Sequence, residues 1–195
     1  MSEERKSIKK RETFETKVKV ELNLDGDGNR DIDSGIKFFD HMLDQLAKHS
    51  GFDLKIEADG DLEIDEHHTV EDIGITLGKA FNEALGNKKG IARFADSVIP
   101  LDETLVRTAV DISGRPFLHT NLEFSRSMVG DLPSELVDEF LKSFTNHAMI
   151  TMHIDLIRGE NCHHQIEAVF KSLAVTLKKA VEIVSDRMPS TKGKI

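Results

Sequence analysis

The sequence predicts an α+β protein made of two similar tandem halves, residues 1–92 and 93–195, packed as one unit. Segments with alternating apolar residues, typical of strands, are interleaved with segments whose apolar residues recur at helical spacing. The order of these segments in the first half recurs in the second half. Each half also contains a His-His-x-x-Glu triplet, at residues 67–71 and 163–167. These observations indicate a duplicated unit with helices on one face of a sheet.

In the first half, strand signals and helix signals are each bounded by turn or capping residues. The expected elements are a strand over Thr13–Leu24, a helix over Ser34–Lys48 capped by Ser34, a hairpin of Phe52–Ala58 with Asp61–Ile64, and a helix over Thr69–Leu85 ended by Gly86. Asp25-x-Asp27-x-Asn29 resembles the start of a calcium loop, but Arg30 stands at its required glycine and Ile36 at its closing glutamate. We interpret that segment as a turn.

The second half repeats this order. The expected elements are a strand starting at Glu103-Thr104, as at Glu15-Thr16, a helix over Ser134–Phe144, a hairpin formed by Ile150–Ile157 and a turn near residues 158–161, and a long helix over Ile166–Val184. In this alignment Asp40-His41 corresponds to Asp138-Glu139, and His49 corresponds to His147. Such self-similarity is typical of gene duplication.

Composition excludes several classes of function. The chain is 38% hydrophobic and 31% charged, and it has no apolar run long enough to span a membrane. The net charge of −9 and the lack of a long basic tract argue against nucleic acid as a partner. The first residues lack the apolar stretch of a secretory signal, and Cys162 is the single cysteine. We therefore expect a cytoplasmic location.

The two triplets have the chemistry of metal ligands. Imidazole and carboxylate groups together suit borderline divalent ions. On a helix His67 and Glu71 share a face, whereas His67 and His68 differ by about 100° around the axis. Neighbouring histidines of one triplet are therefore better placed to bind two different ions. The triplet of the second half, His163, His164 and Glu167, has the same pattern.

Each triplet also has a plainer interpretation. A polar helix start, at which Glu71 complements the helix dipole, would produce one such pattern without a metal. Repetition at matched positions favours metal ligation, and the matched offsets of His41 and Glu139 add these two residues as candidate ligands. A Cys162–His163 nucleophile pair is the less favoured alternative. Arg93, Arg115, Lys171 and Ser190–Lys192 are candidate anion contacts, although each alone is more often a solvated surface residue.

Five sequence motifs together resemble a known family. They are F-F-D-H-M-L-D-Q-L-A-K-H, D-E-H-H-T-V-E-D, G-I-A-R-F, S-G-R-P and E-N-C-H-H-Q-I-E-A-V-F-K. The chain resembles the imidazoleglycerol-phosphate dehydratases of histidine biosynthesis from about Arg11 to Lys192. The resemblance implies that each half is a four-stranded sheet with two helices on one face, a duplication of the kind seen in ribosomal protein S5 domain 2. It also implies a 24-subunit homo-oligomer built from trimers, with active sites between subunits and two Mn²⁺ ions per site.

The resemblance further assigns roles to individual residues. The implied metal ligands are His41, His67, His68, Glu71, Glu139, His163, His164 and Glu167, where Glu139 stands at a position that is His in some members. The implied substrate contacts are Glu15, His49, Arg93, Arg115, Lys171, Ser190 and Lys192. A carboxylate is the expected catalytic base, with Glu15 the first candidate and Glu71 and Glu167 the alternatives. From the ligand types alone, a binuclear metallohydrolase acting on a phosphorylated small molecule is the competing function, and a non-catalytic metal-storage protein is a second.

Overall fold

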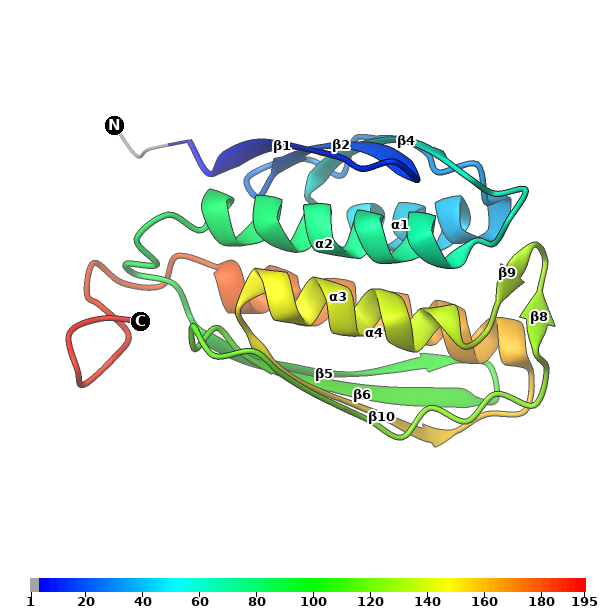
Figure 1. Ribbon diagram of the computed structural model, residues 1–195. Helices are drawn as coiled ribbons and strands as arrows, with labels where there is room; N and C mark the ends of the chain where they lie inside the picture. Colours follow the sequence, from blue (N-terminus) through cyan, green and yellow to red (C-terminus); the bar gives the residue numbers. More distant parts are fainter. Residues whose placement is uncertain (1–3) are drawn as a thin grey trace.

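The computed structural model describes residues 4–195, in which two four-stranded sheets enclose four helices. Figure 1 shows the resulting layers, with the helices between the two sheets. Apolar side chains on the inner faces of both sheets and on the helices form one continuous core. None of the helices in residues 4–195 is long and apolar enough to cross a membrane.

The first half contains one sheet and two helices. Its elements are β1 (Lys6–Glu12), β2 (Thr16–Asn23), β3 (Arg30–Asp33), α1 (Lys37–Ser50), β4 (Asp53–Gly60) and α2 (His67–Ala84). The sheet order is β1-β2-β4-β3, in which β3 runs parallel to β4 and the other pairs are antiparallel. Buried residues alternate along β2, so one face of this sheet packs against the helices.

The second half has the same topology. Its elements are β5 (Phe94–Leu101), β6 (Thr104–Asp111), β7 (Phe117–Thr120), the short strands β8 (Met128–Val129) and β9 (Leu132–Pro133), α3 (Leu136–Ala148), β10 (Thr151–Arg158) and α4 (Cys162–Val181). The sheet order is β5-β6-β10-β7, again with one parallel pair, β7 and β10. This repetition confirms the predicted α+β fold of two similar halves. The division at residues 92 and 93 stays a prediction.

Both predicted hairpins are wrong. Residues 53–60 form a single strand, β4, and the segment expected to pair back on it is a turn at residues 62–64. The partners of β4 are β2 and the short strand β3, which the sequence analysis did not predict. In the second half β10 is likewise a single strand between β6 and β7. The parallel partners are the four-residue segments RDID and FLHT, which are too short to show a clear strand signal.

The outermost strands β1 and β5 were also missed. Strand β1, with the sequence KSIKKRE, is rich in lysine, and β5 contains Pro100. Both features protect edge strands from pairing with other chains, and both lower the apparent strand propensity.

Helix boundaries shift by a few residues. Helix α1 starts at Lys37 instead of Ser34, α3 at Leu136 instead of Ser134, and α2 and α4 start early enough to include both metal-ligand triplets.

The helices pack across the two halves. Helix α1 packs against α4, and α2 packs against α3. The second contact is close because Gly74 and Gly78 of α2 have no side chain. A Cβ built at Gly78 would lie 2.6 Å from the backbone oxygen of Phe144 and 2.9 Å from the backbone nitrogen of Ala148. The sequence of α2 therefore fixes how closely the two halves approach.

The substitution Gly78→Ala tests this contact. Alanine favours the helix more than glycine does, but its methyl group would have to displace the backbone of α3. Overpacking of this kind costs about 1–3 kcal/mol, so we expect a lower unfolding midpoint in denaturant. Lys79→Ala, at the exposed neighbouring position, is the matched control and should leave the midpoint nearly unchanged. Equal midpoints for Gly78→Ala and the wild type would refute the close contact.

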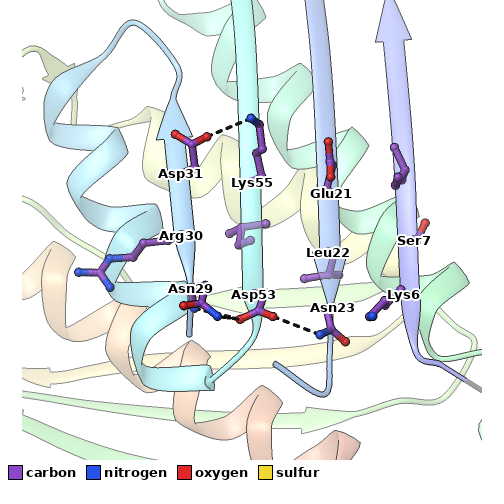
Figure 2. Close-up of a pocket in the computed structure, with 12 residues that line it drawn as sticks. Lys6, Ser7, Glu21, Leu22, Asn23, Asn29, Arg30, Asp31, Asp53 and Lys55 are labelled. Carbon is purple, nitrogen blue, oxygen red and sulfur yellow. Dashed lines mark hydrogen bonds and ion pairs between the residues drawn. The ribbon is translucent and has the colours of Figure 1, made fainter. Parts of the chain in front are cut away.

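Asp53 holds the turn that precedes β3. Its carboxylate accepts hydrogen bonds from the backbone N–H groups of Asp27 and Asn29, both at 3.0 Å, and from the side chains of Asn29 and Asn23 (Figure 2). The segment weighed as a calcium loop is therefore a turn fixed by one carboxylate. Burial raises the pKa of Asp53, but these hydrogen bonds outweigh burial and hold the pKa below its usual value.

Asp53 therefore makes stability depend on pH. A carboxyl with a depressed pKa contributes stability above the unfolded-state pKa of about 3.9, and this contribution is lost as the pH falls through the folded-state pKa. Asp53→Asn should lower stability by roughly 1 kcal/mol at neutral pH. The difference from the wild type should begin to shrink in thermal unfolding as the pH falls below about 3.9, and it should disappear below the folded-state pKa. A difference that does not shrink as the pH is lowered below about 3.9 would contradict this role.

Candidate metal centre

Three predicted metal ligands come together from both halves of the chain. They are His41 of α1 and His163 and Glu167 of α4, whose ligand atoms all lie within 4.8 Å of one another. The Glu167 Oε2 atom is 3.1 Å from His163 Nε2 and 3.4 Å from His41 Nε2. His163 and Glu167 share a face of α4 at the i, i+4 spacing, and the packing of α1 on α4 adds His41.

Glu167 is in the charge state that a metal ligand needs. Burial favours its neutral form, but hydrogen bonds from Lys171 and His163 outweigh burial and hold the pKa of Glu167 below its usual value. The Lys171 ammonium lies 2.5 Å from the Glu167 carboxylate. His49 lies on α1, near Lys171. Burial is the main cause that lowers the pKa of His49, and the positive charge of Lys171 lowers it further. Two further predicted site residues, Lys171 and His49, thus lie beside the cluster.

The second histidine of each triplet points away from the first. The ring planes of His67 and His68 are 85° apart, and those of His163 and His164 are 82° apart. His164 Nδ1 lies 2.8 Å from the Glu103 carboxylate, and His68 Nδ1 lies 3.1 Å from the Asp61 carboxylate. The two histidines of one triplet therefore face different partners, as the helical spacing predicted.

These carboxylates fix the tautomer of the imidazoles. Hydrogen bonds from His164 and from the backbone N–H groups of Asn161 and Glu160 hold the pKa of Glu103 well below its usual value. An ionised carboxylate only accepts hydrogen bonds, so the His164 Nδ1 atom must carry the proton. Glu103 also raises the pKa of His164, so a metal ion must displace the Nε2 proton of the imidazolium before the Nε2 lone pair can bind it. Asp61 acts on His68 in the same way.

The sequence pattern does not indicate Asp61 and Glu103 as orienting groups. Asp72 and Asp40 lie closer in sequence to the candidate ligands, but they have other partners. The Asp72 carboxylate accepts from Arg11 and Thr16, and the Asp40 carboxylate accepts from Ser34 and Lys37. The sequence feature that could have identified Glu103 is the alignment of Glu103-Thr104 with Glu15-Thr16. Glu15 lies 3.8 Å from His68 Nδ1, so both glutamates lie beside the second histidine of a triplet.

The remaining predicted ligands are His67, Glu71 and Glu139. Among residues 4–195 they are not part of the cluster with His41. Glu139 contacts Lys142 and Ser143 of its own helix. Gly74 of α2 faces Phe140 and Ser143 of α3. Glu71 precedes Gly74 by about one helical turn, and Glu139 precedes Ser143 by about one helical turn. The pair α2 and α3 thus repeats the arrangement of α4 and α1.

Four predicted anion contacts line one pocket of about 290 Å³. Arg93, Arg115, Ser190 and Lys192 converge there from the start of β5, the loop after β6 and the C-terminal segment. The Arg93 guanidinium donates to Asp111 and to the carbonyl oxygen of Pro189, and it lies over the ring of Phe94. The side chain of Arg115 is 69% exposed. Arg93 therefore shapes the pocket. Arg115 donates to the carbonyl oxygen of Ser113 and lies 3.9 Å from Asp111, but its exposed guanidinium can still reach an anion.

The metal cluster and the anion pocket lie at opposite ends of the molecule. The Phe38 ring is 5.0 Å from His163, and the Phe38 N–H donates to Asp131 in the β8–β9 turn. The cluster is therefore next to β8 and β9. Figure 1 shows the C-terminal segment, which lines the anion pocket, at the other end of the helices. One chain alone does not bring the two parts together.

Comparison with known proteins gives the same family as the motifs. Residues 34–177 match the sequence profile described as "Imidazoleglycerol-phosphate dehydratase". The imidazoleglycerol-phosphate dehydratase of Methylobacillus flagellatus is 54% identical over 188 residues, which is 95% of each chain. That of Pseudomonas fluorescens is 52% identical over 97% of this chain and 98% of its own.

Two solved structures have the same fold. The crystal structure of the Staphylococcus aureus imidazoleglycerol-phosphate dehydratase has a TM-score of 0.84 and 41% identity, and the match covers 91% of this chain and 99% of that one. The Pyrococcus furiosus enzyme, in complex with (S)-C348, has a TM-score of 0.83 and 35% identity, covering 96% of this chain and 100% of that one. The similarity therefore extends over both halves of the chain.

The Glu103–His164 contact can be tested by the substitution Glu103→Gln. Loss of the ionised acceptor should weaken divalent-metal binding by about 10- to 100-fold. The measurement is a Mn²⁺ titration followed by the electron paramagnetic resonance signal of the free ion. Glu160→Gln is the matched control, because it removes one exposed carboxylate next to the site without removing the partner of His164. Equal affinities for the two variants would contradict an orienting role of Glu103.

Proposed function

This chain belongs to the imidazoleglycerol-phosphate dehydratase family, and from that premise we propose how its residues perform the reaction. The family activity is a dehydration in histidine biosynthesis, in which imidazole glycerol phosphate becomes imidazole acetol phosphate and water. The enzyme must remove a proton from an unactivated carbon and expel a hydroxyl group. We propose that it uses two Mn²⁺ ions per active site, bound by residues of both triplets, and that its location is cytoplasmic.

The donor set fits such ions. Two imidazole nitrogens and one ionised carboxylate converge at His41, His163 and Glu167, and the orientation of His68 and His164 leaves an Nε2 atom free on each. Histidine and glutamate together suit borderline divalent ions better than Mg²⁺ or Ca²⁺. The proposed ligand set is His41, His67, His68, Glu71, Glu139, His163, His164 and Glu167. When bound, the ions would supply positive charge that lowers the cost of deprotonating the imidazole ring of the substrate.

Glu15 is the best-placed carboxylate to move the carbon-bound proton. Its side chain is 54% exposed and lies 3.8 Å from His68, at the edge of the proposed metal centre. Glu167 is less suited to this task because its carboxylate is already held by Lys171, His163 and His41. Glu71 is committed to ligation in this scheme. We therefore assign proton abstraction to Glu15, and we assign contacts with the substrate's polar groups to His49 and Lys171.

The anion pocket would bind the phosphate of the substrate. Arg115 and Lys192 supply positive charge, and Ser190 supplies a hydroxyl donor. Charge-assisted hydrogen bonds of this kind fix both position and orientation. Arg93 contributes from a guanidinium already held by Asp111, so its place in the pocket is set before substrate arrives. Such prior positioning lowers the entropic cost of bringing the reacting groups together.

The separation of metal cluster and anion pocket supports an active site shared between subunits. A substrate as small as imidazole glycerol phosphate cannot extend from one end of the helices to the other, so the pocket that binds its phosphate must come from a neighbouring chain. We propose a homo-oligomer that joins these ends, in the form of a 24-subunit assembly built from trimers. A binuclear metallohydrolase, which the ligand types alone allowed, has no support in the family comparison.

Metal removal is the direct test of this proposal. Protein treated with a chelator should lose dehydratase activity and regain it when Mn²⁺ is added. Mg²⁺ is the control for divalent charge alone, and it should restore little activity because it binds imidazole poorly. The assay is formation of imidazole acetol phosphate, with metal content measured on the same sample. Full activity in protein free of metal would overturn the proposal.

A further inference from the structure

The outer face of the second sheet contains a pair of histidines that the proposed mechanism does not use. His119 of β7 and His153 of β10 are directly opposite each other in the parallel register of the two strands. Both side chains are exposed, and their ring centres are 5.7 Å apart with the planes tilted by 44°. The sequence alone indicates His153 as a strand residue without a metal role, because His119 and His153 are far apart in sequence and form no recognisable motif.

The geometry of the pair suits one shared ion. A borderline divalent ion lies about 2.1 Å from an imidazole nitrogen, and therefore about 3.2 Å from the ring centre. Two imidazoles at a roughly tetrahedral angle around such an ion have ring centres about 5–6 Å apart. The 5.7 Å between His119 and His153 lies in this range, and it is slightly less than the 6.0 Å between His41 and His163 in the metal cluster.

The surroundings leave both imidazoles available. Strand β7 is at the edge of its sheet, so one flank of His119 has no neighbouring strand in residues 4–195. The ring of Phe117 lies 5.6 Å from His153 and covers part of the apolar surface around it. Asp155, two residues further along β10 on the same face, is held by Arg107. No carboxylate therefore competes for the pair within this part of the chain.

We propose that His119 and His153 form a bis-imidazole site for a borderline divalent cation, separate from the catalytic metal centre. Two nitrogen ligands without a carboxylate favour Ni²⁺, Cu²⁺ or Zn²⁺ over Mn²⁺, which is weakest in the Irving–Williams order. The catalytic cluster differs because it includes Glu167 and lies among the helices, on the opposite side of the sheet. Enzyme saturated with Mn²⁺ would therefore leave the surface pair free. Water fills the remaining coordination positions.

The test is a Ni²⁺ titration of the Mn²⁺-loaded enzyme by isothermal calorimetry. The wild type should bind one more Ni²⁺ per chain than the double variant His119→Gln/His153→Gln. Either single variant should show a large loss of affinity, because one imidazole cannot chelate. The double variant should keep its Mn²⁺ content and its dehydratase activity, which shows that it folds and that the catalytic sites are intact.

Phe117→Ala is the matched control on the same face. It removes the aromatic neighbour but keeps both imidazoles, so it should retain the additional Ni²⁺. Equal Ni²⁺ stoichiometry for the wild type and the double variant would overturn the proposal. Loss of the additional ion in Phe117→Ala alone would overturn it as well, because the imidazoles would then not be the ligands.

Discussion

The packing of helices from one half against helices from the other is the constraint on which the site depends. Neither half alone brings a complete set of ligands together. Glu167 and His163 are local neighbours on α4, but His41 reaches them only because α1 packs against that helix. The glycines of α2 set the matching distance to α3. A core made by pairing two copies of one unit thus places ligand side chains from both copies at one end of the helices.

The second determinant of the site is that the two neighbouring histidines of each triplet face different partners. Their side chains leave the helix in different directions because consecutive residues differ by about 100° around the axis. The structure adds a carboxylate behind the second ring of each pair, Asp61 in one half and Glu103 in the other. These contacts engage Nδ1 and leave Nε2 as the atom of each ring that could bind a metal. In the proposed metal centre each triplet would therefore supply two separate imidazole donors, and the carboxylates behind them come from loops next to the strands.

The sequence could predict features that depend on local spacing. The triplets, the helices that contain them and the alternation of β2 and β6 all follow from periods that a single segment displays. The strands β3 and β7 could not be predicted, because segments of only four residues show too little alternation and become strands when a longer partner is beside them. The convergence of Arg93 with Lys192 is equally non-local. Family resemblance, and not spacing, suggested that those two residues belong to one site.

The orienting carboxylates were missed for a similar reason. Asp72 and Asp40 are close in sequence to candidate ligands, yet each is held by another partner. Asp61 precedes its histidine by seven residues, and Glu103 precedes His164 by 61 residues. Contacts of that kind depend on how loops meet the first turn of a helix. Periodicity contains no information about this geometry.

The central claim is that the metal cluster of one chain acts with the anion pocket of another. Mixed oligomers of His163→Ala, which lacks a cluster ligand, and Arg115→Ala, which lacks a pocket cation, test it most directly. Each variant alone should be inactive or nearly so. Dehydratase activity should return when the two variants are co-expressed, because some sites then combine an intact cluster with an intact pocket. A co-expressed mixture that stays as inactive as its parents would show that each site lies within one chain.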